Sequence, residues 1–161
     1  MLNACFVAAE MAAVGMGLPS NTFRDRMQMG PHLLAPTASD LIKYNKIGTA
    51  FASFHYDLNF ITIHGKSRYP GLFLWTREMK KLPVSIPDGC LLLQSGMMFE
   101  HLTGGYVMAG YHEVIYTERT REVAEKKIAE NEAGKEPKNI LWRISSTLFS
   151  HIRYDVDLSP M

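Results

Sequence analysis

Short apolar runs separated by turn residues dominate the sequence from Leu41 onward. The runs are rich in Ile, Leu, Val, Phe and Thr, and Gly, Pro or Asp interrupts them at roughly ten-residue intervals, a rhythm typical of sandwiches and barrels rather than βαβ units. The expected strands are residues 41–45, 50–55, 58–64, 71–75, 82–86, 90–94, 106–108, 111–117 and 140–149. This pattern predicts a mainly β fold of the jelly-roll type.

Two helical patterns precede the strands. Apolar side chains recur at three- and four-residue spacing over residues 2–17, and Gly15 and Gly17 mark the end of this helix. A turn at residues 19–21 then offers an N-cap for a short helix over residues 22–29. We therefore expect an N-terminal helical segment over residues 1–40 and a jelly-roll domain over residues 41–161.

A charged stretch interrupts the β rhythm at about residues 118–138. Glu122 and Lys126 have the i, i+4 spacing that stabilises an exposed helix, and the apolar stripe beside them is narrow. Charge runs of this kind usually form a solvated face. The sequence therefore predicts one inserted surface helix, whose role it does not specify.

The composition excludes several classes of protein. A chain of 161 residues with a formal net charge of +1 has no basic excess, so nucleic acid is not an expected partner. No apolar run approaches the length of a membrane span, and the apolar N-terminus lacks the basic region of a signal peptide. Cys5 and Cys90 match no metal-ligand spacing and are expected to be reduced. A cytoplasmic location follows by default.

His55 and Asp57 form a His-x-Asp pair inside a run of strand-forming residues. Residues i and i+2 of a strand point to the same face, so both side chains can approach one point. With His112 from a later strand, they have the composition of a facial triad that holds Fe(II) and leaves positions open for O₂ and substrate. The alternative is that both histidines are partly buried and bonded to backbone carbonyls.

The order of the motifs resembles that of the isopenicillin N synthase-like and 2-oxoglutarate-dependent non-haem iron oxygenases, from about Leu41 to Pro160. The matching segments are residues 41–44, the run from His55 to Ile63, Pro70-Gly71-Leu72, Gly96, residues 101–106, His112-Glu113-Val114 and Arg143-x-Ser145. The resemblance implies that the jelly roll is a double-stranded β-helix. It also implies an oxidoreductase that uses Fe(II), O₂ and 2-oxoglutarate on a small organic substrate.

The resemblance assigns roles to individual residues. It implies that His55, Asp57 and His112 bind the iron, and that Arg143 and Ser145 hold the carboxylate of the cosubstrate. A guanidinium suits that role because it meets a carboxylate with two hydrogen bonds and stays charged. The alternative is that Arg143 is an arginine on the exposed surface of a strand, with no role in binding.

Three other residues carry weaker expectations. Tyr44 is either a hydrogen-bond donor to cosubstrate or substrate, or a buried tyrosine with an incidental partner. His64 and His101 match no ligand position and are expected to be bystanders.

Two other functional hypotheses remain open. One is an oxidase of the isopenicillin N synthase kind, which uses O₂ without an oxoacid, and the other is an inactive jelly-roll fragment. Glu113 and Met97 both depart from the residues usual in the family. Relatives also carry a substantial region before the segment 15–19, so we expect a truncated chain. Its uncovered strand edges would favour a homo-oligomer or a partner chain on the N-terminal side.

Overall fold

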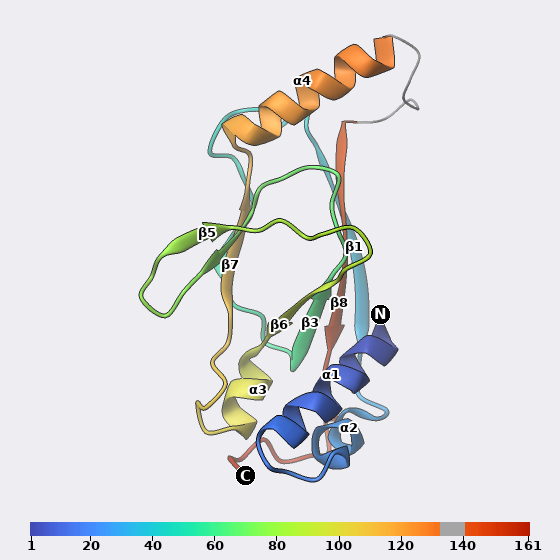
Figure 1. Cartoon of the computed structure of the whole chain (residues 1–161), viewed down its shortest axis with the longest axis vertical. Helices are drawn as coiled ribbons and strands as arrows, with labels where there is room; N and C mark the ends of the chain where they lie inside the picture. The colour runs from blue at the N-terminus through green and yellow to red at the C-terminus, as the bar shows by residue number, and fades with distance from the viewer. Residues whose placement is uncertain (133–140) are drawn as a thin grey trace.

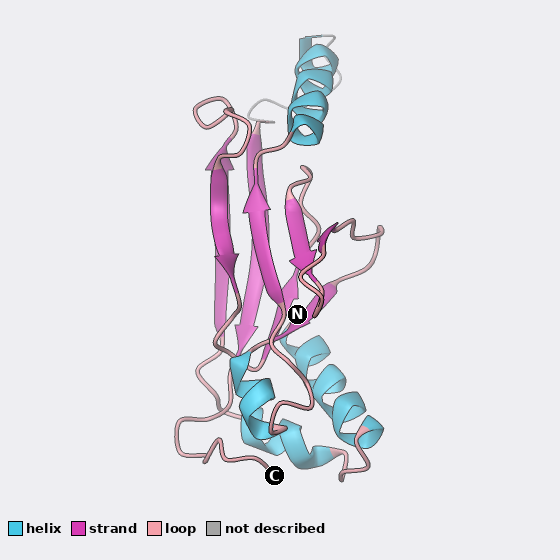
Figure 2. Cartoon of the chain, turned by 90° about the vertical axis from the view of Figure 1, so that its left-hand side faces the viewer, coloured by secondary structure: helices cyan, strands magenta, loops and turns pink. Residues whose placement is uncertain are grey.

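Two antiparallel four-stranded sheets face each other in the computed structural model, which describes residues 1–132 and 141–161. Sheet A has the strand order β1-β8-β3-β6, and sheet B has the order β2-β7-β4-β5. The strands lie between helices at the two ends of the molecule (Figure 2). The strands are β1 (Leu33–Asp40), β2 (Ala50–His55), β3 (Ile61–His64), β4 (Leu72–Trp75), β5 (Lys81–Pro83), β6 (Leu92–Ser95), β7 (Tyr111–Ile115) and β8 (Trp142–Ser150). The expected jelly roll is confirmed.

The first strand of the fold lies earlier than the sequence pattern predicts. Strand β1 falls within the segment expected to be helical and pairs with β8 from Leu33↔Phe149 to Asp40↔Trp142. The expected strand over residues 41–45 is wrong, because the chain turns there. The Asp40 carboxylate accepts hydrogen bonds from the backbone N–H groups of Ile42 and Lys43, which is the turn that a short acidic side chain favours.

The expected strand over residues 106–108 is also wrong, because a loop that follows a short helix, α3 (Met97–Leu102), occupies that position. Gly104 and Gly105 follow the helix with φ of 58° and 84°, a left-handed conformation that glycine adopts without strain. The Glu100 side chain then accepts a hydrogen bond from the N–H of Ala109 at 2.7 Å, which holds the loop against the helix.

The outer face of sheet A carries much of the hydrophobic core. Helices α1 (Leu2–Gly15) and α2 (Asn21–Met27), both at expected positions, pack together, and α1 covers β3 and β8. Buried residues of α1 recur every fourth position, at Cys5, Ala9 and Ala13, so a single face of the helix meets the sheet. The buried members of this cluster are Cys5, Ala9, Ala13, Phe23, Met27, Phe60, Ile61, Ile63, Phe99, Leu102, Leu148 and Ile152.

Helix α4 (Glu118–Glu132) confirms the expected charged surface helix. It lies at the end of the molecule opposite α1, α2 and α3 (Figure 1), where Ala124 packs in a second small cluster with Leu41, Tyr69 and Tyr116. The rest of the expected insertion, residues 133–138, lies outside the described residues, as does residue 140 of the expected last strand. No helix among the described residues is long and apolar enough to span a membrane.

Candidate metal and oxoacid site

The two histidines of the expected triad face each other across sheet B. His55, at the end of β2, pairs in register with His112 of β7, and their rings lie 4.2 Å apart. Asp57 follows two residues after β2 ends, and its Oδ1 lies 3.6 Å from His55 Nε2 and 3.8 Å from His112 Nε2. All three ligand atoms lie within 4.8 Å of one another. The fold thus brings together the three residues that the sequence singled out.

Asp57 is held on both sides. The Thr62 hydroxyl donates to Asp57 Oδ2 at 2.6 Å, which leaves Oδ1 facing the imidazoles. The backbone N–H of Met97, at the start of α3, donates to the Asp57 carbonyl at 2.8 Å. This approach requires glycine at position 96, because a Cβ there would lie 2.0 Å from the carbonyl oxygen of Asn59. The Gly96 motif therefore fixes the loop that carries the carboxylate.

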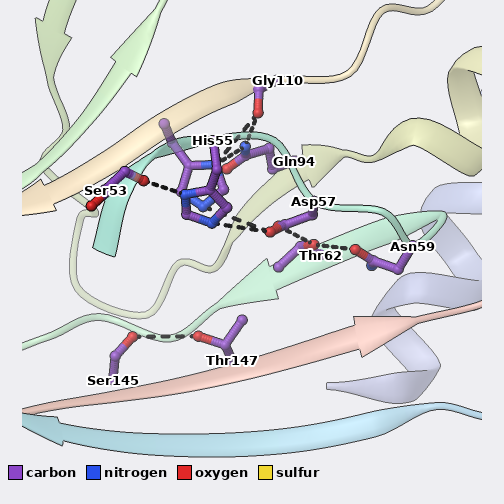
Figure 3. Close-up of polar contacts among 10 residues, drawn as sticks. Ser53, His55, Asp57, Asn59, Thr62, Gln94, Gly110, Ser145 and Thr147 are labelled. Carbon is purple, nitrogen blue, oxygen red and sulfur yellow. Dashed lines mark hydrogen bonds and ion pairs between the residues drawn. The ribbon is translucent and has the colours of Figure 1, made fainter. Parts of the chain in front are cut away.

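The ring nitrogens away from Asp57 are also occupied (Figure 3). His55 Nδ1 lies 2.5 Å from the Ser53 carbonyl oxygen, which can only accept, so His55 donates from Nδ1 and its Nε2 is the ring nitrogen that faces Asp57. The Gln94 amide nitrogen lies 2.6 Å from His112 Nδ1 and also contacts the Gly110 carbonyl oxygen. Outer contacts of this kind orient the imidazoles of metal sites.

The charge state of the site suits a cation. Burial lowers the pKa of the His112 imidazole; the Asp57 carboxylate opposes that shift and His55 adds to it. A neutral imidazole is the form that ligates a metal. Two ligands of one octahedral ion lie about 3 Å apart when each bond is about 2.1 Å, so the observed separations need only a small contraction. The residues therefore fit a divalent metal ion.

Arg143 lies inside the barrel on β8. Along this strand the polar residues Arg143, Ser145 and Thr147 point inward, while Trp142 and Ile144 are exposed, an inversion of the usual apolar-inside pattern. Burial lowers the pKa of the Arg143 guanidinium to about 10. Its Nε has no hydrogen-bond partner, and no ion pair involves it among the described residues. A buried cation without a counter-ion is costly, so this position suits an incoming anion.

One cavity of about 280 Å³ connects the triad and the arginine. It is lined by Thr37, Ala38, Ser39, Phe51, Ala52, His55, Asp57, His64, His112, Val114, Arg143, Ser145, Thr147 and Phe149. The His55 side chain is 42% exposed, whereas those of His112 and Asp57 are buried, so the triad opens toward solvent on the His55 side. The His-Asp-His cluster and the buried guanidinium therefore share one chamber between the sheets.

Three other histidine and tyrosine expectations have different outcomes. Tyr44 lies in the turn after β1, is 45% exposed with the Lys43 ammonium 5.0 Å from its ring centre, and does not line the cavity. His101 is exposed on α3 and also lies outside the cavity. His64 does line it, so the expectation that His64 is a bystander does not describe its position. The alternation Ile61-Thr62-Ile63-His64 contains the signal, because it places Thr62 and His64 on the inner face.

Comparisons with known proteins find relatives by structure only. No family model matches the sequence, and no curated protein sequence matches it. The dioxygenase for auxin oxidation 1 of Arabidopsis thaliana, in complex with 2-oxoglutarate, matches with a TM-score of 0.75 and 20% identity over 99% of this chain and 52% of the other. A Caulobacter crescentus protein described as a 2OG-Fe(II) oxygenase family member matches with a TM-score of 0.70 and 24% identity over 94% and 43% of the two chains.

A third structure, JOX2 in complex with 2OG, Fe and JA, matches with a TM-score of 0.73 and 13% identity. This chain has the fold of the 2OG-Fe(II) oxygenases. The match to JOX2 covers 99% of this chain and 41% of JOX2, so the chain spans about half the length of the oxygenase structures that it matches, or less.

Proposed function

We propose that the chain is a non-haem Fe(II)- and 2-oxoglutarate-dependent oxygenase that acts on a small organic substrate. The observation that supports this most directly is the pairing, in one cavity, of a His-Asp-His cluster with a buried arginine that forms no ion pair with any described residue. The first group suits a divalent cation and the second suits a carboxylate. A 2-oxoacid with a second carboxylate can satisfy both at once.

Each residue has a defined task in this proposal. His55, Asp57 and His112 hold the metal, and bound Fe(II) supplies the activation of O₂. Arg143 and Ser145 hold the distal carboxylate of the oxoacid by charge-assisted hydrogen bonds. These contacts orient the cosubstrate along the cavity, so that its oxoacid end faces the metal ligands.

Binding measurements test the proposal without relying on turnover. Anaerobic Fe(II) is titrated into the chain with and without 2-oxoglutarate, and the visible absorption band of the chelated oxoacid is recorded. We expect His112→Ala to lose iron binding, and Arg143→Ala to keep iron while losing the oxoacid band. His101→Ala and Arg153→Ala are matched controls, since both side chains lie outside the cavity, and they should leave both signals unchanged.

The other outcomes separate the competing hypotheses. Stoichiometric iron binding without an oxoacid band would support an oxidase of the isopenicillin N synthase kind. Absence of stoichiometric iron binding would contradict the proposal and support an inactive jelly-roll chain. Oxygen consumption in the presence of iron, measured with and without 2-oxoglutarate, then distinguishes an active oxygenase from a chain that only binds.

A further inference from the structure

His64 lies on the inner face of β3, which is the neighbour of β8 in sheet A. It pairs in register with Thr147, and alternation along β8 places Ser145 and Arg143 on that same face. His64 is 8% exposed, and its Nε2 is buried without a hydrogen-bond partner among the described residues. A buried imidazole nitrogen without a partner is unusual enough to need an explanation.

The position of His64 joins the metal side of the cavity to the arginine side. Its ring lies 5.6 Å from that of His112. A second cavity of about 420 Å³, which extends toward α4, adjoins the first, and the two share the wall formed by His64, Val114, Arg143 and Ser145. His64 therefore stands beside Arg143 and Ser145 on the wall against which the distal end of a bound oxoacid would rest.

The charge state of His64 is that of a neutral donor. Burial, followed by the neighbouring His112, lowers the pKa of the His64 imidazole to about 4. A neutral imidazole neither neutralises Arg143 nor adds a second cation beside it. It can offer one N–H group, and a carboxylate already bound to a guanidinium retains free lone pairs.

We propose that His64 is a positioning residue that donates a hydrogen bond to the carboxylate held by Arg143 and Ser145. This inference rests on the proposed function, since it takes 2-oxoglutarate as the occupant of the cavity. The carboxylate then has three protein donors from two neighbouring strands of sheet A. His64 thereby contributes to the selection of a dicarboxylic oxoacid over a monocarboxylic one.

The test compares two oxoacids with the iron-loaded chain under anaerobic conditions. 2-Oxoglutarate carries the distal carboxylate, whereas 2-oxopentanoate has the same chain length and lacks it. The variants are His64→Leu, which removes the donor, and His64→Gln, whose amide nitrogen can replace Nε2. His101→Leu is the control for loss of a histidine outside the cavity. Dissociation constants come from calorimetry, and far-UV circular dichroism with a thermal melt verifies that each variant is folded.

We expect His64→Leu to weaken 2-oxoglutarate binding by about tenfold or more, as for loss of a hydrogen bond to a charged group. Binding of 2-oxopentanoate and of iron should change less than about twofold, and His64→Gln should recover most of the affinity. Equal weakening of both oxoacids, no weakening, or no recovery in a folded His64→Gln variant would overturn the role of His64 alone. Failure of the unmodified chain to bind 2-oxoglutarate would instead overturn the proposed function and this assignment with it.

Discussion

Replacement of Arg143 by methionine should stabilise the ligand-free chain while it destroys the oxoacid site. Burial lowers the pKa of the Arg143 guanidinium from its ordinary value to about 10. Because one pKa unit corresponds to about 1.4 kcal/mol, keeping the buried guanidinium charged costs about 3 kcal/mol of folding free energy at neutral pH. Both folded and unfolded chains are protonated there, so the whole cost applies at any pH below about 10 and is relieved only as pH rises above it.

Methionine keeps much of the aliphatic stem and removes the charge. Imperfect packing of the methionine side chain should offset about 1 kcal/mol of this stabilisation. The expected increase in the free energy of unfolding is therefore about 2 kcal/mol. Urea denaturation of the metal-free chain at pH 7.5, with the midpoint and the slope fitted together, measures the gain directly. Arg153→Met is the matched control. Arg153 is paired with Asp155 at the surface, and the change should stay within about 0.5 kcal/mol.

With metal and 2-oxoglutarate added, the unmodified chain should become more stable than Arg143→Met. The unmodified chain gains stability in proportion to the logarithm of ligand concentration, whereas Arg143→Met gains only the contribution of the metal. A loss of stability in metal-free Arg143→Met, with an unchanged slope, would refute the reasoning. That result would mean that contacts within the protein already stabilise the guanidinium, without a bound anion.

Three further predictions concern the surroundings of the site. Gly96→Ala should lower the free energy of unfolding by more than about 2 kcal/mol in urea denaturation, because the added Cβ would lie 2.0 Å from the Asn59 carbonyl oxygen; an unchanged midpoint would contradict the close approach. Thr62→Val should weaken Fe(II) binding by about tenfold or more through loss of the hydrogen bond to Asp57, with an unchanged fold by circular dichroism; equal iron affinity would show that the carboxylate needs no such support. The free energy of unfolding of the metal-free chain should fall by about 2 kcal/mol between pH 7.5 and pH 5 because of His64, since the unfolded imidazole takes up a proton near pH 6.5 and the folded one only near pH 4. In His64→Leu this decrease should be smaller. An equally steep decrease in His64→Leu would assign the pH dependence to other groups.

The parts of the site predicted from sequence are those fixed by strand periodicity. Alternation predicts that His55 and Asp57 lie on one side of the chain and that Arg143 and Ser145 lie on one face of a later strand. In the structure β2 ends at His55, and the contacts of the following loop with Thr62 and Met97 hold Asp57 in place. The structure brings the four predicted residues, with His112, to one cavity. The pairing of His55 with His112 depends on which strands become neighbours, and only the order of motifs shared with a known family indicated that.

The failures come from local contacts that override a pattern of apolar residues. Tyr44 was expected on a strand, but the Asp40 side chain binds the next backbone N–H groups and turns the chain outward. The sequence pattern predicts no element over residues 97–102, where helix α3 forms; the first N–H groups of this helix donate to the carbonyls of Asp57 and Asn59, a tertiary contact that no local pattern indicates. His64 was set aside because it matched no motif, although the period of its own strand already placed it inside.

The inverted pattern of β8 has a consequence for the mechanics of the molecule. One described apolar cluster lies at the end with α1, α2 and α3 and the other under α4, while the stretch between them has the polar wall of the cavity. His55 and His112 belong to sheet B, whereas Arg143 and Ser145 belong to sheet A. A metal ion and an oxoacid bound together would therefore act as a cross-brace between the two sheets in the stretch where the cavity separates the two apolar clusters. Slower amide hydrogen exchange in β7 and β8 of the loaded chain would be the signature of that brace.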